Sequence, residues 1–300
     1  MPVSFRHALA QGPAVAALGR VALSGLRKSH APKALAGSGP WIEARLPPRP
    51  PELVRDYIRH VGGDPAWYRN RLPAHLFPQW GFALAAQALL GLGYPLTKAI
   101  NGGCRIESRK PLPADQPLLV KARIESIDDD GYRAVITQRV VTGTEKVPEA
   151  VIADLRAFIP LRKKEDADGK KAPKARSSVP SDAHEIAFLR IPDTAGLDFA
   201  KLTGDFNPIH WSKRYARAAG FRTVILHGFS TLARSIEALN RGRFAGDPTR
   251  LAMIDAKMTR PLVLPARVGV YVNGSGGIWV GDAPGGGAYL EGHFEMEARS

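Results

Sequence analysis

The chain has 300 residues, of which 44% are hydrophobic, and it carries a formal net charge of +14. This length suggests two domains of roughly 150 residues each, and the composition is sufficient for a sizeable core. Cys104 is the only cysteine, which excludes an intrachain disulfide and a cysteine-rich metal site. No uninterrupted apolar run approaches the ~20 residues of a membrane-spanning helix. A single cysteine fits a reducing compartment, so we expect a cytoplasmic protein.

The positive charge is concentrated in two segments that we expect to lie outside the folded domains. Residues 1–40 contain five basic residues and no acidic residue, and residues 161–180 contain seven basic and three acidic residues. We interpret 1–40 as a basic N-terminal extension with a helix over 8–26, or alternatively as a transit peptide or surface anchor. We interpret 161–180 as a charged linker. Charge confined to such segments argues against a nucleic-acid partner.

Residues 41–160 form the first predicted domain. The proline-rich segment 47–51 cannot continue a helix or a central strand. Apolar residues at helical spacing then predict a helix over 52–60. A second segment, 78–92, is apolar nearly all round, which predicts a buried helix. Strand-like runs follow at 100–108, 117–126, 132–142 and 147–159.

Residues 181–300 repeat this order and form the second predicted domain. A strand over 184–191 and a short helix over 194–201 precede an apolar helix over 225–239. In this repeat, Trp80-Gly81-Phe82 takes the place of His227-Gly228-Phe229. The pattern predicts that a sheet around one buried helix is built twice. The last strand-like runs are 251–260, 267–273, 276–280 and 288–297.

A short loop in the second domain carries the candidate chemistry. Asp205 and His210 stand five positions apart, a spacing that does not share one helical face. Pro208 keeps Asn207 out of the helical conformation, and Gly204 permits conformations that other residues resist. The sequence therefore predicts a shaped loop that brings a carboxylate and an imidazole together. These groups are the usual partners for moving a proton to and from water.

A family resemblance is carried by two strings of residues, Thr203-Gly204-Asp205-Phe206-Asn207-Pro208-Ile209-His210 and Leu226-His227-Gly228-Phe229-Ser230. They resemble the motifs of the MaoC-like hydratase family, the (R)-specific enoyl-thioester hydratases, over about residues 185–300 and more weakly over 41–160. The resemblance implies an α+β double hotdog fold, in which two antiparallel sheets each wrap around a central buried helix and pair within one chain. It also implies a hydro-lyase that converts trans-2-enoyl thioesters reversibly to (R)-3-hydroxyacyl thioesters.

The resemblance also implies a role for the polar groups of this site. Asp205 and His210 would activate one water, and the backbone N–H of Gly228 at a helix N-terminus would stabilise the enolate. Asn207 is assigned to the geometry of the loop, and whether it also contacts the water is left open. His227 is assigned a structural role.

Two further features of the site remain hypotheses at this point. Ser230, one turn into the helix, would either contact the thioester or cap the helix. In the first domain, Gly63-Asp64 stands opposite Gly204-Asp205, but Arg69 occupies the position of His210. We therefore expect the first domain to be catalytically silent and to shape a longer acyl tunnel.

We expect no metal and no redox cofactor, and we expect an acyl-CoA or acyl carrier protein thioester as the partner. The excess of positive charge would attract either anion, and a homodimer is compatible with this interpretation. Two alternatives within the same fold are a hotdog thioesterase and a protein that binds acyl thioesters without turnover. A third is a nucleic-acid or membrane-surface protein that binds through its charge.

Overall fold

A computed structural model describes residues 3–9, 11, 12, 15, 16, 19, 20, 37–162 and 176–297. Most of the predicted helix over 8–26 and of the predicted linker over 161–180 lies outside the described residues. Within the N-terminal extension, helix α1 (Arg6–Leu9) packs on the folded chain, with Nε2 of the buried His7 2.8 Å from Oδ2 of Asp56. No helix in the described part of the chain has the length and apolarity needed to cross a membrane.

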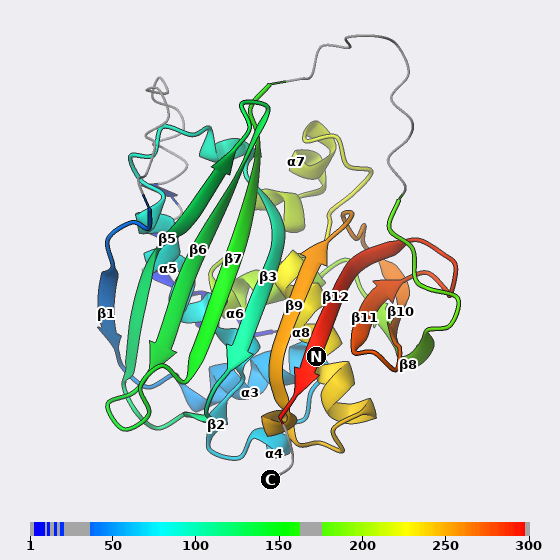
Figure 1. Ribbon diagram of the computed structural model, residues 1–300, viewed down its shortest axis with the longest axis horizontal. Coiled ribbons are helices and arrows are strands. Elements are labelled where there is room, and N and C mark those ends of the chain that lie inside the picture. Colours follow the sequence, from blue (N-terminus) through cyan, green and yellow to red (C-terminus); the bar gives the residue numbers. More distant parts are fainter. Residues whose placement is uncertain are drawn as a thin grey trace.

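The first half builds five strands of a large sheet and the buried helix α5, which begins at Pro78 as predicted (Figure 1). The predicted helix over 78–92 ends earlier, at Ala88. The elements in order are β1 (Ile42–Leu46), α3 (Pro51–His60), α4 (Pro65–Tyr68), β2 (Arg71–Leu72), η1 (Ala74–Leu76), α5 (Pro78–Ala88), η2 (Leu96–Lys98), β3 (Ile100–Ser108), β4 (Leu112–Pro113), β5 (Leu118–Asp129), β6 (Arg133–Gly143) and β7 (Val151–Pro160).

The second half repeats this plan around helix α8. Its elements are β8 (His184–Ile191), α6 (Ala195–Thr203), η3 (Pro208–His210), α7 (Lys213–Ala218), α8 (Gly228–Gly242), η4 (Pro248–Arg250), β9 (Leu251–Met258), β10 (Ala266–Val272), β11 (Gly277–Gly281) and β12 (Ala288–Met296). The predicted bounds of the helix over 225–239 are wrong at both ends. Ile225 bridges to Val263 and the Leu226 N–H donates to the Leu262 carbonyl at 2.8 Å, which keeps this segment extended until Gly228.

The strands of both halves join in one ten-stranded antiparallel sheet, in the order β1-β5-β6-β7-β3-β9-β12-β11-β10-β8. The halves meet edge to edge, because β3 pairs with β9 from Gly103 opposite Lys257 to Glu107 opposite Met253. Both buried helices lie behind this sheet in Figure 1. They touch through aromatic rings, with the Phe82 and Phe229 centroids 5.2 Å apart.

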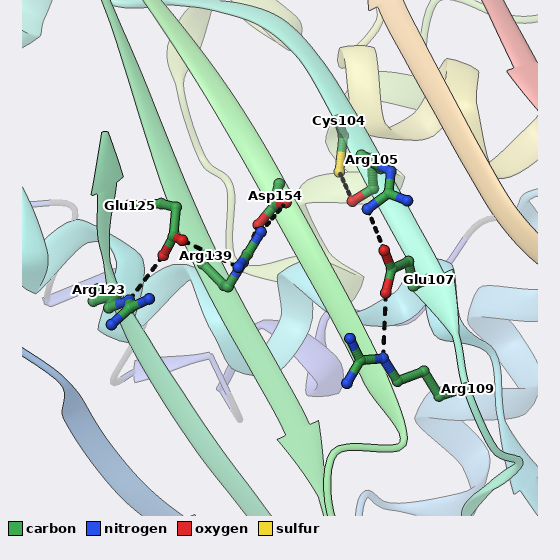
Figure 2. A network of polar contacts seen from close by, with 8 residues as sticks. All are labelled: Cys104, Arg105, Glu107, Arg109, Arg123, Glu125, Arg139 and Asp154. Carbon is green, nitrogen blue, oxygen red and sulfur yellow. Dashed lines mark hydrogen bonds and ion pairs between the residues drawn. The ribbon is translucent and has the colours of Figure 1, made fainter. Parts of the chain in front are cut away.

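Buried and more exposed side chains alternate along the strands, because one face of the sheet packs on the helices and the other faces water. Along β5, for example, buried and more exposed side chains alternate from Leu118. On the water side, Arg139 of β6 bonds both Asp154 of β7 and Glu125 of β5, at 2.7 and 3.1 Å (Figure 2). Ion pairs this exposed are each worth only about 0–1 kcal/mol, so their main effect is to favour this strand register.

The internal repeat corrects one detail of the sequence analysis. In the second half the Leu264 N–H donates to the Val224 carbonyl, and in the first half the Ala114 N–H donates to the Asn70 carbonyl at the same place. Pro73 is therefore the counterpart of His227, with nearly the same backbone angles, and Ala74 at the start of η1 is the counterpart of Gly228. The sequence alignment of Gly81 with Gly228 was displaced by about two helical turns.

Candidate active site

The loop between α6 and η3 is held in shape by its own backbone and short polar side chains. Helix α6 ends at Gly204, which has a left-handed conformation with φ of 85°. The Asn207 N–H donates to Oδ1 of Asp205 at 3.3 Å, and Oδ1 of Asn207 accepts from the Ile209 N–H at 3.3 Å. These bonds turn the chain so that His210 points inward, where it is only 8% exposed.

The hydrogen bond of His210 fixes which ring nitrogen is available for chemistry. Nδ1 lies 2.8 Å from the Ile225 carbonyl oxygen. A carbonyl can only accept, so Nδ1 carries the hydrogen and Nε2 of the neutral ring keeps its lone pair. Burial lowers the pKa of His210, opposed by the negative charge of Asp205 and by the Ile225 carbonyl. The ring is therefore neutral and able to accept a proton at neutral pH.

His227 contacts both the His210 ring and the backbone of Asp205. Its ring stacks on that of His210 at a centroid distance of 3.6 Å, and its Nε2–H donates to the backbone carbonyl of Asp205 at 3.0 Å. Burial, followed by the neighbouring His210, holds the pKa of His227 well below its usual range. This neutral ring therefore packs against His210 and braces the Asp205 backbone without adding charge.

The N-terminus of α8 faces the same place. Gly228 is its first residue, and the first N–H groups of a helix have no partner within the helix. A Cβ at Gly228 would lie 2.9 Å from Nδ2 of Asn101 and 3.1 Å from Cγ of Met258, so a larger residue would crowd the helix start. Glycine therefore permits a close approach between α8 and β3.

A groove of about 180 Å³ runs from Asp205 and Phe229 into the first half of the chain. Its walls are mostly apolar side chains of α5, of its C-cap residue and of β7, including Phe82, Ala85, Ala86, Leu89, Leu155 and Ala157. The Asp205 side chain is 22% exposed and lines the groove, and its Oδ2 lies 3.9 Å from Nε2 of the buried His227. A polar pair at the end of an apolar groove suits a substrate with a long hydrocarbon part.

The structure brings four of the six predicted site residues together and separates two. Asp205, His210 and His227 each offer a ligating atom within 4.8 Å of the others, beside Gly228. Such a set has the donor types that hold a cation, and the expectation of no metal stays a prediction. Asn207 is exposed and bonds only within its loop among the described contacts.

Ser230 lies away from the groove. Its side chain is fully buried, and its hydroxyl has no hydrogen-bond partner among the described residues. It neither caps α8 nor lines the groove. Sequence reasoning missed Asn101, which lines the groove from β3. The signal for it was Gly102-Gly103, since paired glycines within a strand indicate a bulge or a close backbone approach.

The equivalent end of the first half is built differently. Asp64 caps α4 by accepting from the Ala66 N–H at 2.9 Å, and Arg69 has a positive φ of 51°. A groove of about 210 Å³ at this end is lined in part by Tyr68 and His75. Nε2 of His75 lies 3.1 Å from Oε1 of Glu237, and both side chains are buried. This end thus holds a hydrogen-bonded buried cluster in place of the Asp-His loop.

Similarity to solved structures shows which fold the chain has. The chain has the fold of a Mycobacterium tuberculosis protein whose structure is described as a double hotdog, with a TM-score of 0.55 and 10% identity over 87% of this chain and 96% of that one. The chain is accordingly a double hotdog protein, with its two sheets fused at the β3–β9 seam. Residues 170–283 match the family model described as MaoC like domain. The second half is therefore the part of the chain that is similar to this family.

Two relatives are similar to this chain in sequence. The peroxisomal enoyl-CoA hydratase 2 of Arabidopsis thaliana is 26% identical over 181 residues, which cover 56% of this chain and 58% of the relative. The 3-hydroxyacyl-thioester dehydratase X of M. tuberculosis is 26% identical over 219 residues, covering 71% of this chain and 73% of the relative. The match thus spans less than two thirds of the Arabidopsis relative's length.

Proposed function

We propose that the chain is a hydro-lyase that hydrates trans-2-enoyl thioesters reversibly to (R)-3-hydroxyacyl thioesters. The observation that carries the proposal is the convergence of the Asp205 carboxylate and the His210 imidazole beside the N-terminus of α8 and at the end of an apolar groove. Both relatives described above have names that refer to this reaction in one direction or the other.

In the proposed reaction, one water binds between Asp205 and His210. Nε2 of His210 takes a proton from this water while its oxygen bonds to C3 of the enoyl group. The electron pair of the C2–C3 double bond moves toward the thioester carbonyl and forms an enolate. His210 then returns the proton to C2 on the same face, and Asp205 orients the water throughout. Atoms and charge balance without a further reactant.

The enolate oxygen needs a hydrogen-bond donor at the moment when its charge develops. We assign this role to the Gly228 N–H, which also benefits from the partial positive charge of the α8 N-terminus. The apolar walls contributed by α5 and β7 would receive the acyl chain. In this proposal the first half is catalytically silent and serves as the wall of the acyl tunnel.

The proposal also names the class of substrate. The substrate is an acyl-CoA or acyl carrier protein thioester, and neither a metal nor a redox cofactor takes part. A homodimer and the absence of a nucleic-acid partner remain predictions. A cytoplasmic location is a prediction as well, and the name of the Arabidopsis relative places that protein in the peroxisome.

The proposal is tested by supplying crotonyl-CoA and following two signals. Loss of the enoyl absorbance without release of free thiol is the expected result. Release of thiol with the enoyl absorbance intact would mean a thioesterase. Tight binding of crotonyl-CoA with neither signal would mean a protein that holds acyl thioesters without turnover.

A further inference from the structure

Strand β3 carries a β-bulge at the point where it passes the N-terminus of α8. Its ladder with β7 shifts between Asn101, which pairs with Ala157, and Gly103, which pairs with Arg156. Gly103 has φ of 145°, and a Cβ there would collide with the Ala256 carbonyl oxygen of β9. Bulges redirect side chains and are common beside active sites. Here the bulge aims Asn101 toward α8.

The orientation of the Asn101 amide follows from one hydrogen bond. Its Oδ1 accepts from the Gly103 N–H at 2.9 Å. The oxygen is thereby fixed, so Nδ2 with its two hydrogens points the other way. Nδ2 lies 2.9 Å from the place where a Cβ of Gly228 would stand, and Asn101 lines the groove together with Asp205. No acceptor in the described part of the chain bonds Nδ2.

The two ends of the seam provide an internal comparison. In the β3–β9 ladder, the first paired residue of β3 is Gly103 and the first paired residue of β9 is Met253. Two residues before these positions stand Asn101 in β3 and Leu251 in β9. At the helix starts, Gly228 corresponds to Ala74, which keeps a backbone N–H. The side-chain donor of Asn101 is thus present at the end that holds Asp205 and His210, and it is replaced by Leu251, which has no side-chain donor, at the other end.

We propose that Nδ2 of Asn101 is a second donor to the thioester oxygen, beside the Gly228 N–H. The enolate would then receive one hydrogen bond from each half of the chain. The first half, which has no Asp-His loop of its own, would thus supply a catalytic residue to the site of the second half in addition to the wall of the tunnel. The inference rests on the proposed hydration, and it adds a residue from outside the segment that matches the MaoC-like domain.

Two variants remove the donor in different ways. Asn101→Asp keeps the shape and the bond to the Gly103 N–H but replaces the donor with an oxygen. Asn101→Leu reproduces the residue found at the other end of the seam. We expect kcat for crotonyl-CoA hydration to fall about 10²-fold in both, the usual cost of one lost donor to an oxyanion, with KM changed about threefold or less and the melting temperature retained. Asn273→Asp makes the same chemical change in a distant turn, where Oδ1 accepts from the Gly277 N–H at 2.9 Å, and should leave kcat unchanged.

A second readout observes the hydrogen bond directly. Butyryl-CoA labelled with ¹³C at its carbonyl is saturated at C2–C3 and cannot be hydrated. Its bound carbonyl stretch should lie at lower frequency in the wild type than in either Asn101 variant. If the wild type hydrates crotonyl-CoA and both Asn101 variants keep its rate and its carbonyl frequency, the role of Asn101 is overturned and the proposed function stands. If the wild type does not hydrate crotonyl-CoA, the proposed function and this inference are both overturned.

Discussion

At the residue scale, the site depends on keeping one imidazole neutral beside one carboxylate. The Ile225 carbonyl holds the hydrogen on Nδ1 of His210, and burial lowers the pKa of that ring. His227 stacks on it as a second neutral ring. A proton accepted by Nε2 of His210 would therefore be stabilised by Asp205, which is the acidic side chain that lowers the cost of charging His210. The pair can thus carry a proton briefly and release it.

Substitution of either member of the pair should abolish most of the activity without unfolding the protein. In Asp205→Asn and His210→Gln the side-chain size is nearly kept, but the carboxylate or the basic nitrogen is lost. We expect kcat for crotonyl-CoA hydration to fall by about 10²- to 10⁴-fold, the usual contribution of a positioned acid or base. Stopped-flow or steady-state loss of enoyl absorbance measures this.

The matched control for these variants is His184→Gln, which changes an exposed imidazole at the start of β8. It should keep wild-type kcat. A variant of Asp205 or His210 that retains more than a tenth of the wild-type rate would remove that residue from the proposed mechanism.

At the element scale, the bulge in β3 and the start of α8 form one unit. Gly103 allows β9 to approach β3 closely, and Gly228 allows α8 to approach Asn101. The two glycines thus set the distance between the seam of the sheet and the helix that carries the candidate donor.

Gly103→Ala should destabilise the protein and disturb the site together. The new Cβ would meet the Ala256 carbonyl oxygen, and the positive φ of 145° is unfavourable for alanine. We expect a loss of roughly 1–3 kcal/mol in the free energy of unfolding, measured by urea denaturation. The control is Gly39→Ala, where the nearest atom would lie at 3.5 Å, an ordinary contact. Equal stability of the two variants would contradict this account of the bulge.

The same elements show what the sequence could and could not predict. The loop over 204–210 was predictable, because Gly204 and Pro208 restrict the backbone locally and the motif is contiguous. The double hotdog fold was predictable from the resemblance and the repeat. Asn101 was missed, because its place in the site depends on the packing of β3 against Gly228 at the start of α8, which lies far away in the sequence.

Helix starts were the other weak point. The apolar pattern continues from Ile225 into α8, but the bonds to Leu262 and Val263 hold the first residues extended. A similar error in the first half placed Gly81 opposite Gly228, whereas Ala74 at the start of η1 takes that position. Periodicity locates a buried helix well, whereas its first residue is decided by tertiary hydrogen bonds.

At the scale of the whole molecule, fusion of the two sheets places α5 of the first half against the candidate site of the second. The groove reaches from Asp205 along α5, so in the proposed function the length of the acyl chain would be set by residues distant in sequence from the motif. The first half therefore serves as the specificity wall in this account.

Ala86→Phe should shorten the space for the acyl chain. Ala86 lines the groove from α5 and is buried, so a phenyl ring there fills part of the volume. We expect the ratio of kcat/KM for a ten-carbon over a four-carbon enoyl-CoA to fall by about tenfold or more, which corresponds to ~1.4 kcal/mol of lost discrimination. Leu90→Phe, just beyond α5 and outside the groove lining, is the control and should keep the wild-type ratio. An unchanged ratio in Ala86→Phe would place the acyl chain elsewhere.

Buried neutral histidines should make the whole fold sensitive to acid. Burial, followed by the charge of Arg234, lowers the pKa of His60 to about 3, and the pKa values of His210 and His227 are lowered as well. Unfolded histidine takes up a proton near pH 6.5, so the unfolded state binds more protons below that pH. Stability is therefore complete above pH 6.5 and falls as the pH drops toward 3.

For His60 alone, the loss at pH 5 is about 2 kcal/mol relative to pH 7.5. Urea denaturation at the two pH values measures the total, and His60→Gln should reduce the difference. A free energy of unfolding that stays constant between pH 7.5 and pH 5 would contradict the burial of these neutral rings.

The central claim is that Asp205 and His210 act on one water at one face of an enoyl thioester. It is tested most directly by hydration of crotonyl-CoA with chiral analysis of the product, in the wild type and in a protein that combines Asp205→Asn and His210→Gln. The account predicts the (R)-3-hydroxyacyl thioester alone from the wild type, and no product above background from a folded double variant. An (S) or mixed product, or an (R) product formed equally well by the double variant, would contradict it.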